Sequence, residues 1–139
     1  MALTLARHPW SVWVAKLSAL SAALVNQVTG SDGKSFWSLT QTESEISLVS
    51  DISEHEDFVS SEGPWTVFQV EGELDFSLTG VLNSLTAPMA TAGVSIFAIS
   101  TYDTDYILVK QEVGDRAAEV WSSSGVTIVA RDASADKGA

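Results

Sequence analysis

Two stretches of this sequence place small polar residues where strands are expected to end. Asp75–Gly80 leads from a strand-like run into a helix-like run, and Ser100–Asp105 separates two β-rich runs. A helix start offers free backbone N–H groups and the positive end of the helix dipole, which suit an anionic group. The carboxylates of Asp103 and Asp105 could instead pair with a cationic group. The two junctions therefore indicate a binding site for a small polar ligand.

Catalytic or metal chemistry is not indicated by these residue types. Asp103 and Asp105 could be considered an acid/base pair, but no nucleophile, base or metal is evident to assist them. The sequence has no cysteine, which excludes disulfides, thiolate nucleophiles and cysteine-ligated metals. Glu54–Asp57 could suggest a metal site around His55, although adjacent loop residues rarely converge on one ion. We expect a chain that is not an enzyme and uses no cofactor or metal.

The second half of the chain alternates strand and helix patterns. Trp65–Glu71 alternates with period two, as a half-buried strand does. Ser77 or Thr79 could cap a helix that runs to about Thr91, with a proline inside it. Its apolar face is expected on Leu78, Leu82, Leu85 and Met89. Two strands, a second helix and a last strand are then expected at Val94–Ser100, Tyr106–Val109, Gln111–Ser123 and Val126–Ala130.

This order of elements predicts an α+β fold with a ferredoxin-like βαββαβ arrangement. Val94–Ser100 is expected to be a central strand, because apolar residues occupy both of its faces. The first half resembles a shortened version of the same arrangement. Strands are expected there at Leu3–Leu5, Ser11–Leu17, Ser35–Thr40 and Glu45–Ser50, with a break at His8-Pro9 and a short helix or irregular crossing at Ser18–Val28.

The acidic, aperiodic segment Asp51–Pro64 is the expected boundary between the two halves. We therefore predict a degenerate N-terminal repeat at residues 1–63, a regular domain at 64–131 and a flexible tail at 132–139. The apolar run Leu17–Val25 is too short to span a bilayer, and the residues before it favour a strand over a signal peptide. A cytoplasmic protein is expected.

Composition narrows the classes of partner. Acidic residues number 18 and basic residues 7, which gives a formal net charge of −11 over 139 residues. Nucleic acids and anionic membranes both require clustered basic residues, so neither is expected as a partner. Hydrophobic residues make up 45% of the chain, enough to form a core.

Residues 65–130 resemble an ACT domain, the small βαββαβ module that senses amino acids in metabolic enzymes. The resemblance rests on Glu71–Gly80, which reads EGELDFSLTG, and on Ser95–Val109, which reads SIFAISTYDTDYILV. It is greatest to short tandem ACT proteins, and extends to the ACT repeats of the CASTOR arginine sensors and of aspartokinases. The arginine sensors carry four ACT repeats, whereas two are expected here, so pocket and specificity could differ.

The resemblance implies tandem ACT repeats with antiparallel sheets, helices on one face and a ligand site at the interface between repeats. It implies a regulatory, allosteric protein whose effector is a free amino acid, arginine or another, and which forms a homodimer or acts on a regulated protein partner. Carried over by position, the implied ligand-binding residues are Asp75, Phe76, Ser77, Leu78, Thr79, Gly80, Ile99, Ser100, Thr101, Tyr102, Asp103 and Asp105.

An amino acid could use these residues in a definite way. The helix start suits its carboxylate, Asp75 could accept from its ammonium group, and Asp103 or Asp105 could pair with a cationic side chain. Each residue also has a purely structural alternative. Ser77 and Thr79 could be helix caps, Asp103 and Asp105 could belong to an ordinary hairpin turn, and Gly80 could permit close packing. The second functional hypothesis is therefore an ACT module that mediates assembly without a ligand.

Overall fold

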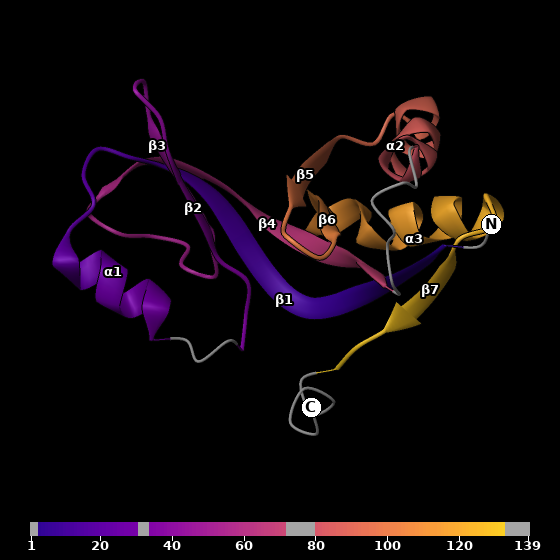
Figure 1. Ribbon diagram of the computed structural model, residues 1–139, viewed down its shortest axis with the longest axis horizontal. Coiled ribbons are helices and arrows are strands. Elements are labelled where there is room, and N and C mark those ends of the chain that lie inside the picture. The colour runs from indigo at the N-terminus through magenta and orange to yellow at the C-terminus, as the bar shows by residue number, and fades with distance from the viewer. Residues whose placement is uncertain (1–2, 31–33, 72–79, 133–139) are drawn as a thin grey trace. The chain divides into compact units, whose positions relative to one another are not determined.

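The computed structural model describes residues 3–30, 34–71 and 80–132 (Figure 1). The chain divides into two compact units: unit 1 consists of Met1–Pro9 and Thr66–Ala139, and unit 2 of Trp10–Trp65. Two long strands, β1 (Thr4–Leu17) and β4 (Phe58–Glu71), contribute residues to both units. None of the helices in the described residues is long and apolar enough to cross a membrane.

Unit 1 has the α+β, ferredoxin-like arrangement expected from the sequence. After the C-terminal part of β4, its elements are α2 (Val81–Ala92), β5 (Ile96–Ser100), β6 (Asp105–Lys110), a 3-10 turn at Gln111–Val113, α3 (Gly114–Ser123) and β7 (Thr127–Ala130). The strand order is β7-β1-β4-β6-β5. The N-terminal part of β1 pairs in parallel with β7, from Thr4 opposite Thr127 to Arg7 opposite Ala130. The first strand of the chain therefore lies between β4 and β7, the first and last strands of the βαββαβ order.

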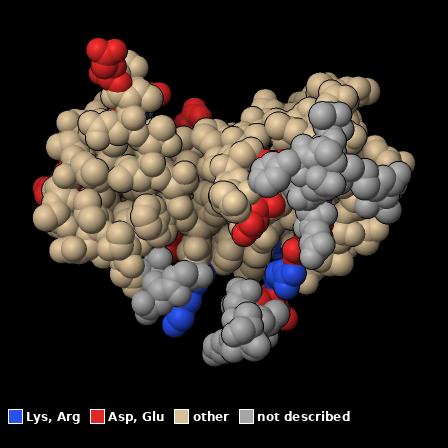
Figure 2. Space-filling model, viewed as in Figure 1, with Lys and Arg blue, Asp and Glu red and all other residues tan. Residues whose placement is uncertain are grey.

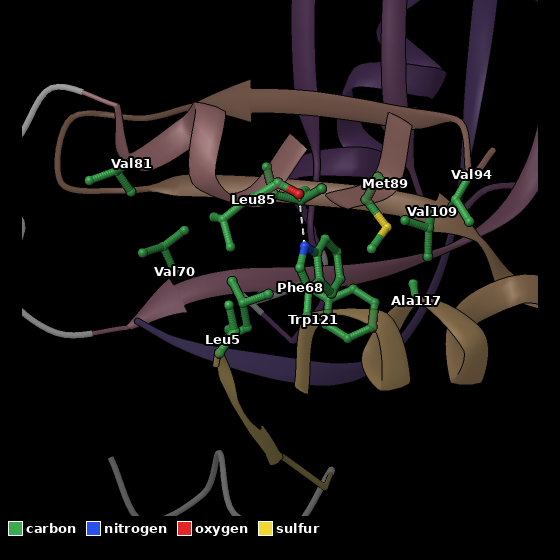
Figure 3. Packing of buried hydrophobic residues seen from close by; sticks show 12 residues of the cluster. Leu5, Phe68, Val70, Val81, Leu85, Met89, Val94, Val109, Ala117 and Trp121 are labelled. Carbon is green, nitrogen blue, oxygen red and sulfur yellow. Dashed lines mark hydrogen bonds between the residues drawn. The ribbon is translucent and has the colours of Figure 1, made fainter. Parts of the chain in front are cut away.

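The core of unit 1 forms where α2 and α3 pack together against the strands (Figure 3). Val81, Leu85 and Met89 lie on one face of α2 at spacings of four residues, as the helical period requires. Trp121 of α3 is fully buried, and its ring meets that of Phe68 edge to face with centroids 4.9 Å apart. These contacts fix both helices on the sheet.

The predicted apolar face of α2 is wrong at one position. Leu85 and Met89 are fully buried as expected, but Leu82 is 37% exposed and Val81 takes its place in the core. The predicted position Leu78 lies outside the described residues. Leu82 is one residue, and therefore roughly 100° around the helix, away from the buried Val81.

Unit 2 has a shortened arrangement of the same kind. The C-terminal part of β1 is followed by α1 (Ala22–Thr29), β2 (Ser38–Gln41), β3 (Ile46–Ser50) and the first part of β4, in the strand order β2-β3-β1-β4. Residues 51–57 connect β3 to β4 and contain no helix. The helix α1 packs on a separate core that includes Leu17, Leu24 and Leu48.

Three further expectations about strands are wrong. β1 runs without a break through His8-Pro9, because a strand can accommodate proline where no ladder donor is needed. β4 begins at Phe58, inside the segment that the sequence indicates as a boundary. β5 lies at the end of the described strand order rather than in its centre, and Ile96, Phe97 and Ile99 are only half-buried. The domain limits at residues 63/64 and 131/132 stay predictions.

Candidate functional site

The predicted site residues fall into two groups. Asp75, Phe76, Ser77, Leu78 and Thr79 lie outside the described residues. The others are described: Gly80 precedes α2, Ile99 and Ser100 end β5, Thr101–Asp103 form the connection, and Asp105 begins β6.

The connection between β5 and β6 is a tight hairpin turn. Ser100 pairs with Asp105 across the two strands, and the Ser100 hydroxyl donates to Oδ1 of Asp105 at 2.5 Å. The backbone N–H and the hydroxyl of Thr101 both donate to the carbonyl oxygen of Thr104, at 2.8 and 3.0 Å. Two hydroxyls and one carboxylate of the predicted set are thus engaged within the turn.

The turn is attached to the end of β4. The Thr104 hydroxyl donates a 2.7 Å hydrogen bond to the carbonyl oxygen of Val70, the next-to-last residue of that strand. Val70 also shares a core cluster with Val81, the first residue of α2, and Figure 3 shows their side chains at the same end of this core. The start of α2 and the β5–β6 turn therefore meet at the end of β4.

Negative charge gathers beside this turn. Burial raises the pKa of Tyr106, and the nearby carboxylates of Glu71 and Asp103 raise that pKa further. Arg131 forms an ion pair with Glu71. The side chain of Tyr102 is 86% exposed at the tip of the turn. Carboxylates in such a place can accept hydrogen bonds from an ammonium or guanidinium group.

Gly80 occupies the N-cap position of α2 in a left-handed conformation, with φ of 84°. Glycine adopts this conformation without the steric cost that other residues meet. Among the described residues, no atom lies within 4 Å of the place where a Cβ atom at Gly80 would be. Gly80 supplies no side-chain cap, and the predicted caps Ser77 and Thr79 lie outside the described residues.

No metal cluster is found among the residues that the structure describes. His55, which the sequence sets among acidic residues, accepts a 3.0 Å hydrogen bond from the backbone N–H of Asp57 through Nδ1. The ring of His55 lies 5.9 Å from that of Phe58. These contacts are local and structural.

The sequence argument missed three residues that shape this region: Glu71, Thr104 and Arg131. A threonine in a turn gives no sign that it will reach the strand 34 residues earlier. The pairing of Glu71 with Arg131 joins positions 60 residues apart and likewise has no local pattern. The one feature of this region that the sequence does show is the pair of acidic residues in the turn, Asp103 and Asp105.

Comparison with known proteins agrees with this description. Residues 60–121 match the family model of the ACT domain. The chain is 33% identical over 87 residues to the human protein CASTOR3P. The match covers 53% of this chain and 53% of CASTOR3P, so the chain spans about half the length of that curated relative.

Two solved structures are similar over most of the chain. Protein Atu0741 from Agobacterium tumefaciens is 28% identical, with a TM-score of 0.78 and coverage of 94% of this chain and 95% of that one. The regulatory subunit of aspartate kinase from Thermus thermophilus shares the fold, with 12% identity and a TM-score of 0.57. The match covers 86% of this chain and 95% of that subunit. Residues 60–121 of this chain are therefore similar to ACT domains in sequence, and the chain resembles ACT-containing proteins in fold.

Proposed function

We propose that this chain is a non-enzymatic regulatory protein that binds a free amino acid through its ACT domain. The observation that carries the proposal is the meeting of the α2 start and the β5–β6 turn at the end of β4, linked by the Thr104–Val70 hydrogen bond. A helix start and an acidic turn at one end of unit 1 support this proposal. A related fold occurs in the regulatory subunit of an aspartate kinase, which supports a regulatory role.

The chemistry of the two elements matches the two charges of an amino acid. The first-turn N–H groups of α2, which follow Gly80, suit the carboxylate. Asp75 is the proposed acceptor for the ammonium group. Asp103 and Asp105 favour a cationic side chain, which makes arginine the first amino acid to test. The ligand would act by favouring one conformation or oligomer of a cytoplasmic protein.

A second candidate is an assembly module without a ligand. Among the described strands, β2, β5 and β7 each pair with only one other strand, and a strand edge can pair with another chain. The two candidates make different predictions for ligand addition. An assembly module would form its oligomer or bind its protein partner whether or not an amino acid is present.

A thermal-shift screen against the twenty amino acids separates the candidates. A ligand that binds only the folded protein raises its melting temperature in proportion to the logarithm of its concentration. We expect a rise for one or two amino acids, abolished in Asp75→Ala and reduced in Asp103→Asn. Asp51→Asn, an exposed carboxylate in unit 2, is the matched control and should keep the wild-type response. No rise at about 10 mM for any amino acid would favour the assembly module.

A further inference from the structure

Unit 2 contains a small cavity of about 90 Å³ that is lined by α1 and by the strands β2 and β3. Six apolar residues on these elements, or just before them, form most of its wall: Leu20, Val25, Val28, Trp37, Leu39 and Leu48. All of them lie within Trp10–Trp65, whereas the candidate ligand site is in unit 1. The proposed function therefore does not explain this cavity.

The wall of this cavity is entirely apolar. Among the described lining residues none is charged, and Thr29 alone carries a hydroxyl. That hydroxyl donates a 2.8 Å hydrogen bond to the carbonyl oxygen of Val25, within α1. Water gains little in such a place, because a bound water needs about two to four polar partners. The cavity therefore suits an apolar occupant.

Exposed apolar side chains gather around the cavity. Half of the eight large hydrophobic residues that are exposed in the described part of the chain line it: Leu20, Val25, Trp37 and Leu39, each 36–42% exposed. Val28 and Leu48, by contrast, are buried, so the cavity has a buried floor and a rim in contact with water. All eight residues of α1 are uncharged, and Figure 2, drawn in the view of Figure 1, shows tan atoms at the place of α1. Single exposed apolar residues are ordinary, but a group of them around a cavity is typical of a binding site.

The size and polarity of the cavity restrict what it can hold. An apolar protein cavity of about 150 Å³ lined by leucine, isoleucine and phenylalanine takes up benzene or xenon. The cavity in unit 2 is smaller but has an open rim, so it has room for one ring or one branched alkyl group. A free amino acid is a poor occupant, because its ammonium and carboxylate groups would lose water without gaining hydrogen-bond partners from the wall. The matching ligand is small, uncharged and apolar.

We propose that this cavity is a binding site for a small uncharged apolar molecule with the size of a benzene ring. The molecule would rest on Val28 and Leu48 and contact the indole ring of Trp37, which offers a large apolar surface. It would remove exposed apolar area of the rim from water, which is the main favourable contribution to its binding. The inference goes beyond the amino acid ligand of the proposed function and does not depend on it.

The test is a titration of the full ¹⁵N-labelled chain with benzene, followed by amide NMR spectra. We expect changes in chemical shift that saturate and that are confined to α1, β2, β3 and the residues that adjoin them. Val25→Phe enlarges a side chain of the rim and should weaken benzene binding at least about tenfold. Val59→Phe makes the same substitution on β4, at a residue of unit 2 that is 62% exposed and does not line the cavity, and should leave binding unchanged.

A second pair of variants tests the polarity of the site. Leu39→Asn places an amide on the rim and should weaken benzene binding, whereas Leu82→Asn, at an equally exposed leucine of α2 in unit 1, should not. Unchanged melting curves of the variants in the absence of benzene would show that their folds are intact. Shifts that do not saturate, or that spread over both units, would overturn the proposal, because benzene would then only partition onto the surface. Wild-type binding by Val25→Phe, or an equal loss in Val59→Phe, would overturn it as well.

Discussion

The indole Nε1 of Trp121 donates a 2.8 Å hydrogen bond to the carbonyl oxygen of Leu85, inside the core of unit 1 (Figure 3). Trp121 is on α3 and Leu85 on α2, so this bond joins the two helices of unit 1 directly. Pro88 lies three residues after Leu85 and brings no N–H of its own to this part of the helix. The missing N–H would have bonded to the carbonyl of Ser84, four residues earlier, and the indole of Trp121 donates to the next carbonyl along the helix, that of Leu85.

Replacing Trp121 with phenylalanine should destabilise unit 1 strongly. The change removes the indole donor from a buried carbonyl and leaves a gap beside Phe68, and we expect a loss of about 2–4 kcal/mol in the free energy of unfolding. Urea denaturation measures it. Trp37→Phe is the matched control, because Trp37 is 42% exposed, and it should cost less than about 0.5 kcal/mol. Equal losses in the two variants would contradict the proposed role of the hydrogen bond.

Gly63 cannot be replaced by alanine without a shift of its neighbours. A Cβ atom there would lie 2.5 Å from Cδ1 of Trp13 and 2.9 Å from the backbone oxygen of Val12. We expect Gly63→Ala to cost about 2 kcal/mol or more. Gly93→Ala is the comparison: Gly93 has φ of 73° but open space around it, so only backbone strain applies, about 1 kcal/mol. A smaller loss for Gly63→Ala than for Gly93→Ala would show that the clash is relieved.

The stability of unit 2 should fall in acid because of Asp57. Its Oδ2 accepts from the hydroxyl and the backbone N–H of Ser21, at 2.6 and 3.0 Å, and these bonds lower the pKa of Asp57 below its ordinary 3.8. A carboxyl group whose pKa is lower in the folded chain than in the unfolded chain stabilises the fold at pH values above its unfolded-state pKa. This stabilisation is lost as the pH falls through the pKa of the group in the folded chain.

Urea midpoints measured at about pH 6 and about pH 3 check this dependence. Asp57→Asn should lower the midpoint at the higher pH and reduce the difference between the two. Asp51→Asn, whose carboxylate is exposed, should keep the wild-type difference. An undiminished acid dependence in Asp57→Asn would rule out Asp57 as its source.

The raised pKa of Tyr106 offers a direct probe of the candidate site. In a Tyr102→Phe background, Tyr106 is the one remaining tyrosine, so the ultraviolet absorbance of tyrosinate reports on it alone. Its pKa should lie above 10.0, mainly because of burial and also because of Glu71 and Asp103. Asp103→Asn should lower that pKa part of the way, whereas Glu54→Gln in unit 2 should not change it. An unchanged value in Asp103→Asn would place its carboxylate farther from Tyr106 than the structure does.

Local patterns predicted the helices and short strands of unit 1 well. The spacing of Leu85 and Met89 identified the buried face of α2, and period two identified the C-terminal part of β4. The error at Leu82 arose because residue spacing gives a helical stripe but not the rotation of the helix on its sheet. The full lengths of β1 and β4 were missed since Pro9 and Gly63-Pro64 read as breaks, and only pairing with distant strands sustains a strand through them.

The candidate site was predictable in part. Composition alone indicated a polar turn at Tyr102–Asp105, and the order of elements indicated a helix start near Gly80. The bond from Thr104 to Val70 and the pairing of Arg131 with Glu71 depend on tertiary folding, which no sequence window contains. The predicted roles of Asp75 and its neighbours in ligand binding stay predictions.

The most direct test of the account is a calorimetric titration of the purified chain with arginine and then with the other amino acids. We expect saturable binding of one or two amino acids, absent in Asp75→Ala, weakened in Asp103→Asn and unchanged in Asp51→Asn. No heat of binding for any of the twenty at millimolar concentrations, confirmed by unchanged melting temperatures, would contradict the proposal that this chain senses a free amino acid.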